Sequence, residues 1–259
     1  MHRLLPAPFL AICIAALPLR AQAATEPLAV PRPKAAAAAT FERLGDSLAW
    51  AGARDRAFAG SGKRLVVSVL DRRIWWMDGR DTLFTAPVAV GTGDTLSHAE
   101  ERWEFATPRG SRRIMGKERD PVWTPPLWHY VEAARKKDRE VVELSRGRGY
   151  TLHDGSRLVV RGDQVGQLRT DGIFVPVPAG DEIVFDDIHF VPPLGTRNRK
   201  VGTELGAYKL DMGDGYLIHG TPHKESIGDA VTHGCVRVGD EALAYLYRVV
   251  PVGTRVVIY

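Results

Sequence analysis

Short hydrophobic runs alternate with turn residues along most of the chain, which is the pattern of a β-rich fold. Three such runs lie at residues 65–70, 73–76 and 87–90; Asp71 begins the break after the first, an Asp-Gly turn at 78–79 follows the second, and a Gly-rich turn at 91–93 follows the third. Apolar, β-branched and aromatic side chains pack well on a pleated sheet, and closely spaced turns favour an antiparallel meander over alternating strands and helices. We therefore predict strands at these ranges within an antiparallel sheet.

Large apolar residues recur at helical spacing in three places. We predict helices at about residues 41–59, 128–145 and 240–249, the last of which stops before Pro251. Strand-like segments lie between the second and third helices, at residues 150–153, 157–161, 165–169 and 183–185. Because the turns among them are Asp-Gly turns of the hairpin type, we predict a folded α+β insertion at about 127–193.

The N-terminus has the pattern of an export signal. His2 and Arg3 precede an apolar run at residues 4–19, and an Ala-Gln-Ala triplet follows. The run is short for a bilayer span and the triplet suits signal peptidase, so residues 1–23 are predicted to be a cleaved signal peptide. An uncleaved membrane anchor is the alternative. Residues 24–59 are then an Ala/Pro-rich spacer and a short helix, and the protein is expected to be exported to the periplasm or cell envelope.

Composition places the remainder among soluble globular proteins. The 259 residues are 44% hydrophobic and 25% charged, which argues against disorder and against several membrane spans. This length accommodates one catalytic domain, predicted at residues 60–259, with the insertion inside it. The formal net charge of +4 loses two units when the signal is removed. Basic clusters are not interleaved with aromatic residues, so no nucleic-acid partner is expected.

Cys235 is the candidate nucleophile of this domain. Signal cleavage removes Cys13 and leaves Cys235 as a lone thiol in an oxidising compartment, where it has no disulfide partner within the chain. A buried, inert cysteine is the alternative. Two histidines, His219 and His233, lie nearby in the sequence, and an imidazole that takes the thiol proton produces the nucleophilic thiolate. This combination is the minimum that acyl transfer requires.

The spacing leaves the choice of base open. In an extended segment His233 and Cys235 point to the same face, whereas His219 reaches them only if its strand lies alongside. Gly220 and Gly234 flank the reactive positions, and a residue without Cβ lets the backbone approach a substrate closely. Backbone N–H groups of residues 233–235 are therefore predicted to form an oxyanion hole.

These residues resemble a known family. The pattern of a histidine followed by Ser/Thr-His-Gly-Cys, a hydrophobic residue and Arg or Asn is similar to the signature of L,D-transpeptidase catalytic domains of the YkuD type. Further similarity lies in the Thr-Pro-x-Gly turn at 107–110, the Pro-x-Trp-x-Pro-Pro segment within 120–126 and the Leu-Gly-x-Tyr strand at 205–208. In order, the matching stretches span roughly residues 63–259.

The resemblance implies a fold and a set of roles. The fold would be mostly β (α+β), a β-sandwich or open barrel with a C-terminal helix. The implied catalytic residues are His219 as base, the Gly220 carbonyl that orients its ring, Cys235 as nucleophile, and His233 and Gly234 at the oxyanion site. The implied binding residues are Arg237, which holds the loop or a substrate carboxylate, Thr232 in the place of the commoner serine, and Tyr216 as a further oxyanion donor.

The same resemblance implies the reaction. Cys235 would form a thioester with a peptidoglycan stem peptide, and an amine of another stem or water would then release it, giving a 3→3 cross-link or a hydrolysed donor. The resemblance implies no cofactor, peptidoglycan stem peptides as partners, and carbapenems as covalent inhibitors. We expect a monomer. The 127–193 insertion has two readings, a cap over the substrate groove or a stabilising appendage.

Three other functions fit parts of the pattern. A structural zinc site could use nitrogen and sulfur ligands, but its short-spaced ligand pairs are missing here. A cysteine peptidase or amidase of the wall would carry its cysteine before the histidine. A catalytically silent wall-binding module would lack the nucleophile or the base. The zinc site would use His219, His223, His233 and Cys235 as its ligands. The other four histidines are expected to have structural roles only; they are His98, His129, His153 and His189.

Overall fold

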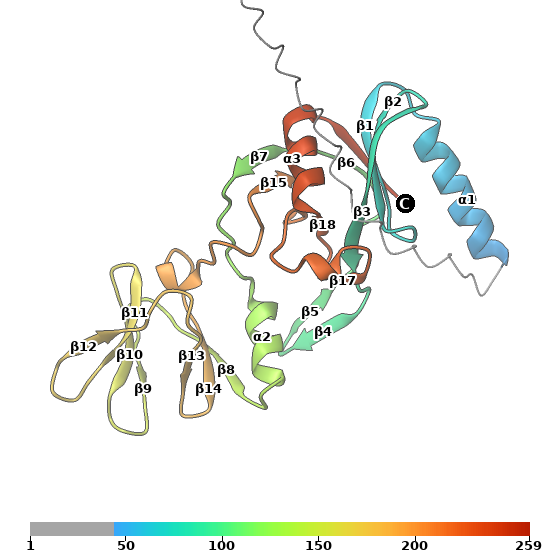
Figure 1. Cartoon of the computed structure of the whole chain (residues 1–259). Coiled ribbons are helices and arrows are strands. Elements are labelled where there is room, and N and C mark those ends of the chain that lie inside the picture. The colour runs from blue at the N-terminus through green and yellow to red at the C-terminus, as the bar shows by residue number, and fades with distance from the viewer. Residues whose placement is uncertain (1–43) are drawn as a thin grey trace, which may run out of the picture. The chain divides into compact units, whose positions relative to one another are not determined.

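The computed structural model describes residues 44–259, so the predicted signal peptide and most of the predicted spacer lie outside the described residues. The fold is mostly β, as predicted, with three α-helices among these residues: α1 (Leu44–Phe58), α2 (Leu127–Arg135) and α3 (Asp240–Val249). Two short 3-10 turns are η1 (Arg197–Arg199) and η2 (Lys224–Ser226). Figure 1 follows the chain through these elements.

The largest sheet has ten strands. Nine are hydrogen-bonded in the order β6-β19-β1-β2-β3-β18-β16-β15-β7, and β17 pairs with β3. Their bounds are β1 (Lys63–Ser68), β2 (Arg73–Asp78), β3 (Asp81–Gly91), β6 (Gly110–Arg113), β7 (Gly116–Arg119), β15 (Tyr208–Asp211), β16 (Leu217–His219), β17 (Ala230–Thr232), β18 (Val236–Val238) and β19 (Arg255–Ile258). A separate hairpin joins β4 (Thr95–His98) to β5 (Glu101–Glu104).

The predicted antiparallel sheet is only partly correct. Strands β1 to β3 form the expected antiparallel meander, but β19 pairs in parallel with β1, β16 with β18, and β17 with β3. Parallel neighbours need a long connection, and residues 220–235 provide one between β16 and β18. Helix α3 then carries the chain from β18 to β19, which lies near the other edge of the sheet. The sheet is therefore mixed.

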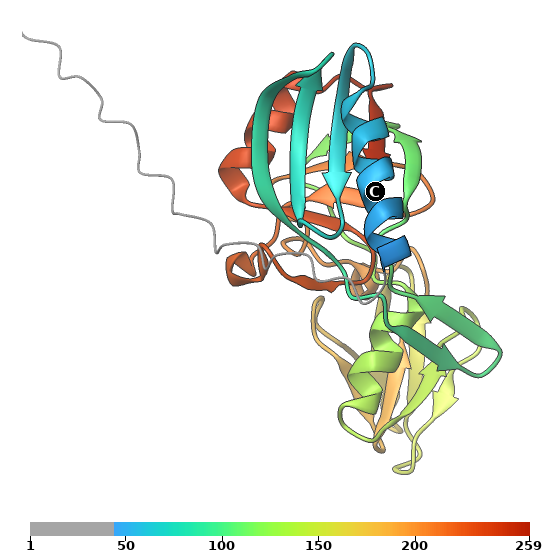
Figure 2. The same cartoon turned by 90° about the vertical axis from the view of Figure 1, so that its right-hand side faces the viewer.

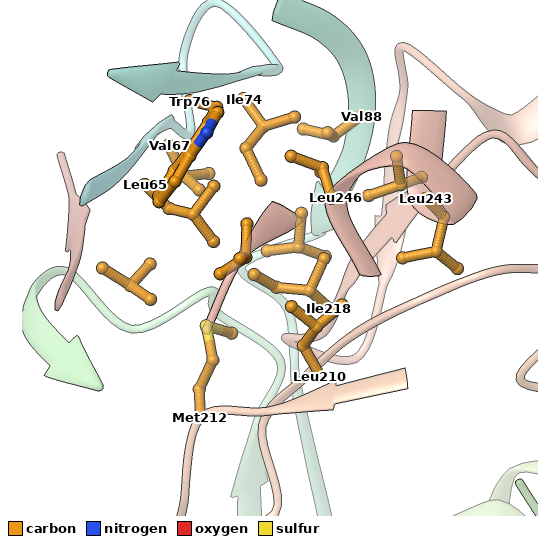
Figure 3. Packing of buried hydrophobic residues seen from close by; sticks show 14 of the residues in the cluster. Leu65, Val67, Ile74, Trp76, Val88, Leu210, Met212, Ile218, Leu243 and Leu246 are labelled. Atoms are coloured by element: carbon orange, nitrogen blue, oxygen red, sulfur yellow. The ribbon is translucent and has the colours of Figure 1, made fainter. Parts of the chain in front are cut away.

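The sheet curls until its two edges come close together. Its edge strands β6 and β7 follow each other in the chain and are separated only by Ile114 and Met115. The Ile114 N–H donates to the carbonyl of Thr254 at one edge, and the Met115 N–H donates to that of Asp211 near the other. The strands and α3 enclose one apolar core, in which Leu243 and other labelled side chains converge (Figure 3). This is the open-barrel arrangement that was predicted.

Helix α1 covers the outer face of β1 and β2 (Figure 2), which explains why β1 is apolar on both faces. Leu65 and Val67 point into the main core, while Val66 packs with α1. Arg64 is fully buried, and its guanidinium donates to the carbonyl oxygens of Ala57 at 3.0 Å and of Phe58 at 2.8 Å. It thereby satisfies backbone acceptors that the end of α1 leaves without helical partners.

The segment predicted as an insertion forms α2 and two small sheets. The sheets have the orders β12-β11-β10-β9 and β13-β14-β8, and they share an apolar core that includes Phe190 and Leu158. Their bounds are β8 (Glu140–Glu143), β9 (Tyr150–Thr151), β10 (Arg157–Arg161), β11 (Gln164–Leu168), β12 (Phe174–Pro176), β13 (Ile183–Phe185) and β14 (Ile188–Val191).

The prediction of a helix at 128–145 was wrong at its C-terminal end. Helix α2 ends at Arg135, and the chain turns at Asp138, whose φ of 51° is left-handed. The next residues form β8, which pairs in parallel with β14. Pairing with β14, which lies 48 positions further along the chain, thus overrides the helical pattern of Val and Leu residues in this segment.

Arg199 ties together the two places where the chain enters and leaves the insertion. Its guanidinium donates to the carbonyl of Pro125 at 2.7 Å and to that of Pro192 at 2.7 Å, and it lies 4.7 Å from the ring centroid of Tyr130. The side chain is buried. These contacts hold the base of the insertion against α2.

We expect Arg199→Met to lower the free energy of unfolding by about 2–4 kcal/mol, because two buried carbonyl oxygens lose charged donors. Urea unfolding monitored by tryptophan fluorescence measures this change. Lys200→Met, at the exposed neighbouring position, is the matched control and should change stability little. Equal stability of the two variants would contradict the assigned role of Arg199.

Candidate active site

A cavity of about 960 Å³ lies where β16 and β18 meet the start of α2. Six residues proposed from the sequence line it, namely Thr232, Tyr216, His219, His233, Cys235 and Arg237. Gly220 and Gly234 are chain neighbours of lining residues and do not line the cavity themselves. The structure therefore brings together side chains that are up to 21 positions apart in the sequence.

The strand register explains how the thiol and the first histidine meet. Strands β16 and β18 are parallel, with Ile218 opposite Val236, and both of these side chains enter the core. Since side chains alternate along a strand, the residues on either side of them face the opposite way. These residues are Leu217, His219, Cys235 and Arg237, and all four line the cavity.

His219 is held in one orientation by its own neighbour. Its Nδ1 lies 2.5 Å from the carbonyl oxygen of Gly220, and because a carbonyl only accepts, Nδ1 carries the proton and Nε2 keeps its lone pair. Burial lowers the pKa of His219 to about 4, and the nearby Arg237 charge acts in the same direction. At neutral pH the ring is therefore an uncharged acceptor.

Gly220 is required by close backbone packing. A Cβ at Gly206 would lie 2.8 Å from the Gly220 Cα, and one at Gly220 would lie 3.2 Å from the Gly206 Cα. Gly206 also has a φ of 66°, which glycine adopts without the penalty that a side chain brings. This contact fixes the carbonyl that orients His219.

The Cys235 thiol rests in its neutral form. Burial raises the pKa of Cys235, and a hydrogen bond from the Leu217 backbone and the Arg237 charge offset part of that rise. The Sγ lies 3.9 Å from the carbonyl oxygen of Gly215. A neutral thiol and a neutral imidazole in one cavity favour proton transfer during the reaction over a preformed ion pair.

The loop that carries the thiol is shaped by Thr232 and Gly234. The Thr232 hydroxyl donates to the Cys235 carbonyl at 2.6 Å and accepts from the Gly234 N–H at 3.2 Å. Gly234 has a φ of 115°, so the chain leaves the extended conformation here. His233 and Cys235 therefore do not lie in one extended segment, although both line the cavity. A substrate contact of Thr232 stays a prediction, since its hydroxyl is engaged within the loop.

Gly234→Ala should distort this loop, because a Cβ would lie 2.8 Å from the Tyr216 ring and 3.0 Å from the Ala106 carbonyl oxygen. We expect a loss of about 1–3 kcal/mol in the free energy of unfolding and a slower reaction of Cys235 with acylating agents. Gly228→Ala is the matched control: its φ is 100°, but nothing lies within 4 Å of the added Cβ. Thermal unfolding and acylation rates measure both effects, and equal losses in the two variants would contradict the steric argument.

Two residues of α2 hold the His233 ring, and the sequence analysis identified neither of them. Trp128 stacks on the imidazole with centroids 4.0 Å apart and planes at 16°, and Phe105 meets it edge-on at 4.4 Å. Glu132 Oε2 lies 2.9 Å from His233 Nε2. Trp128 and Glu132 are four positions apart, which places them on one helix face. The sequence shows that spacing, but it contains no signal that the helix contacts a residue 101 positions away.

Charged and aromatic groups complete the wall. Arg237 approaches Glu204 at 3.9 Å, and its Nε is buried with no hydrogen-bond partner among the described residues. Tyr216 lies under the Arg112 guanidinium, 4.8 Å from the ring centroid, and its predicted contact with an oxyanion stays a prediction. His129, for which only a structural role was predicted, also lines the cavity.

Residues 44–259 contain no cluster of metal-binding side chains and no membrane-spanning helix. No three His, Cys, Asp or Glu side chains in this range converge as a metal ion requires, and this includes the four residues considered for a zinc site. None of the helices here is long and apolar enough to cross a bilayer.

Comparisons with known proteins give a consistent family. A family model described as the L,D-transpeptidase catalytic domain (YkuD) matches residues 62–258. The Escherichia coli K12 protein YbiS, named a probable L,D-transpeptidase, is 50% identical over 52 residues, which are 20% of this chain and 17% of that protein. The Bacillus licheniformis protein YkuD, whose name places it in the same family, is 32% identical over 111 residues, which are 42% of this chain and 59% of that protein. The matches thus span less than two thirds of these relatives.

Solved structures are similar at lower identity. An L,D-transpeptidase structure from Xylanimonas cellulosilytica has a TM-score of 0.40 and 16% identity, and the match covers 77% of this chain and 61% of that one. An L,D-transpeptidase structure from Mycobacterium smegmatis has a TM-score of 0.38 and 16% identity, with 77% and 59% covered.

Proposed function

The chain belongs to the L,D-transpeptidase catalytic domain family, and from this membership and the geometry of the cavity we propose that it transfers acyl groups of peptidoglycan stem peptides through Cys235. One observation carries the proposal. The Cys235 thiol and the buried, neutral His219 come from adjacent parallel strands and line the same cavity. A nucleophile and a base in one cavity are what covalent acyl transfer requires.

The first step forms a thioester. His219 Nε2 takes the thiol proton, and Sγ attacks the carbonyl carbon that precedes the terminal D-residue of a tetrapeptide stem. The carbonyl π electrons move to oxygen, and their return breaks the C–N bond. The amine of the departing D-alanine takes the proton from His219, so the base is neutral again at the end of the step.

The developing oxyanion is stabilised by the backbone N–H groups of His233 and Cys235, with Tyr216 as a further donor. The Gly234 N–H, which was also predicted as a donor, is engaged by the Thr232 hydroxyl. The left-handed turn at Gly234 supports this role, because it bends the chain beside the nucleophile. Arg237 provides positive charge on the cavity wall and binds a substrate carboxylate or holds the loop.

The second step releases the acyl group. An amine of a second stem, or water, gives a proton to His219 and attacks the thioester carbonyl, and the departing sulfur recovers that proton. An amine gives a 3→3 cross-link, and water gives a shortened donor. We propose that the insertion forms part of the substrate groove, which is supported by the position of Trp128 and His129 on the cavity wall.

We also infer that the protein works in the cell envelope as a monomer. The basic, apolar and small-residue pattern of residues 1–23 supports export. The mass and oligomeric state of protein recovered from the envelope fraction test this inference, and an intact N-terminus in a cytoplasmic protein would contradict it.

The proposed function is tested by incubating reduced mature protein with disaccharide-tetrapeptide and, separately, with a carbapenem. Intact-protein mass spectrometry should show an adduct on the protein, and product analysis should show a cross-linked dimer or released D-alanine. A folded, reduced protein that forms neither adduct nor product would refute the proposal in favour of a silent wall-binding module.

A further inference from the structure

We propose that Glu132 is a positioning residue of this reaction: its carboxylate, carried by helix α2 of the insertion, fixes the His233 imidazole in one tautomer and one plane beside Cys235. The inference rests on the proposed function and deepens it. It assigns a part of the active site to the insertion, which a minimal catalytic domain would not need.

Three groups constrain the His233 ring. Glu132 Oε2 is 2.9 Å from Nε2, Trp128 covers one face at 4.0 Å, and Phe105 meets the ring edge-on at 4.4 Å. The His233 and Glu132 side chains are 29% and 27% exposed, so solvent screens this contact less than it would a surface pair. Stacking fixes the ring plane, while the hydrogen bond fixes the rotation of the ring within that plane.

The carboxylate also selects the tautomer. An ionised carboxylate only accepts hydrogen bonds, so the hydrogen at this contact belongs to His233 Nε2. In the neutral ring Nδ1 then keeps the lone pair. His219 has the reverse arrangement, because its Nδ1 donates to a carbonyl. His219 and His233 are therefore held in opposite tautomers by two different acceptors.

The position of His233 in the chain gives this constraint its effect on the reaction. His233 lies between Thr232, which anchors the loop, and Gly234, whose φ of 115° leaves the backbone without side-chain restraint. A clamped His233 ring limits rotation of the peptide groups on both sides of it. One of these groups carries the His233 N–H that is proposed to meet the oxyanion, and the other carries the Gly234 N–H that donates to Thr232 and shapes the turn before Cys235. An oxyanion donor must be placed to within a fraction of an ångström.

The insertion holds α2 firmly enough to serve as the support. Val131 and Ala134 on α2 are fully buried, and Tyr130 packs against Arg199. The Arg199 guanidinium in turn donates hydrogen bonds to backbone carbonyls at both ends of the insertion. Glu132 thus projects from a fixed helix, and rigid elements position supporting groups more accurately than loops do.

The test compares wild type with Glu132→Ala, Glu132→Gln and the matched control Glu140→Ala, which removes an exposed carboxylate from β8. Two-bond ¹H–¹⁵N correlation spectra of histidine-labelled full-length protein report the tautomer of His233, whose signals are assigned with His233→Asn. Pre-steady-state acylation by a carbapenem reports the rate, and thermal unfolding reports the fold.

We expect wild type and Glu140→Ala to keep the Nε2–H tautomer and the same acylation rate. Glu132→Ala should show mixed tautomers and acylate roughly 10- to 100-fold more slowly, at nearly unchanged thermal stability. Glu132→Gln keeps an acceptor oxygen, so it should retain the tautomer and recover most of the rate.

Two outcomes overturn the inference. A single Nε2–H tautomer in Glu132→Ala would show that the carboxylate does not select it, and an unchanged acylation rate would show that the ring's constraint does not serve the reaction. Failure of the proposed function has a different signature, since wild type itself would then form no adduct and no product, whatever the tautomer of His233.

Discussion

Replacing Cys235 with alanine is expected to abolish thioester formation and to lower turnover by at least about 10⁴-fold, because removal of a covalent nucleophile leaves only binding and oxyanion stabilisation. The fold should persist. Cys235 is only partly buried, and its thiol makes one long contact with the Gly215 carbonyl at 3.9 Å. Intact-protein mass spectrometry with a carbapenem and release of D-alanine from a tetrapeptide substrate measure the loss.

Cys235→Ser is the matched variant. It keeps the size and the hydrogen-bonding capacity of the side chain but offers a much weaker nucleophile at neutral pH. We expect it to be as inactive as the alanine variant and to unfold at the wild-type temperature. Turnover retained by either folded variant would refute the assignment of Cys235 as the acylated residue.

Replacing His219 with glutamine is expected to lower the acylation rate by about 10²–10⁴-fold, the usual contribution of a positioned general base. Burial lowers the pKa of His219 to about 4, so the wild-type base is neutral from pH 7 down to about pH 5. The acid limb of the wild-type rate profile should therefore lie near pH 4. His219→Gln should lack this limb, and a His219→Gln profile that keeps it would assign the limb to another group.

The same pKa has a consequence for stability. His219 is neutral in the folded protein and titrates near pH 6.5 when unfolded, so acid favours the unfolded state, which binds the additional proton. The stability of wild type should be complete above about pH 6.5 and fall as the pH drops toward 4. Urea unfolding at several pH values should show a shallower fall in His219→Gln. His153→Gln, at an exposed histidine, is the control and should keep the wild-type slope.

Local pattern predicted several elements closely. Helix α3 and the strands β10 and β13 have the bounds expected from the sequence, and β1 to β3 form the expected meander. These elements were legible because their apolar periodicity and the turns that limit them lie within a few residues of one another. The C-terminal half of the helix predicted at 128–145 was wrong, since pairing of β8 with β14 decides that segment.

The sequence by itself also indicated a chemistry. The Cys235 thiol with two nearby histidines predicted acyl transfer, and the family match agrees with that prediction. The sequence did not decide between His219 and His233 as the base, because a ring's protonation and contacts depend on what surrounds it. The structure gives the two rings different partners: Nδ1 of His219 donates to the carbonyl of Gly220, whereas Glu132 engages Nε2 of His233. The role of His219 as the base stays a prediction.

Only the tertiary structure showed that residues of the predicted insertion contact His233. Trp128 and Glu132 approach His233 across more than 100 positions, and the meeting depends on how α2 docks and on the left-handed turn at Gly234. Local sequence carries the identity of a reactive group and the strand or helix on which it lies. Contacts between distant segments depend on packing and strand register summed over the whole fold, and no short window of the sequence contains that information.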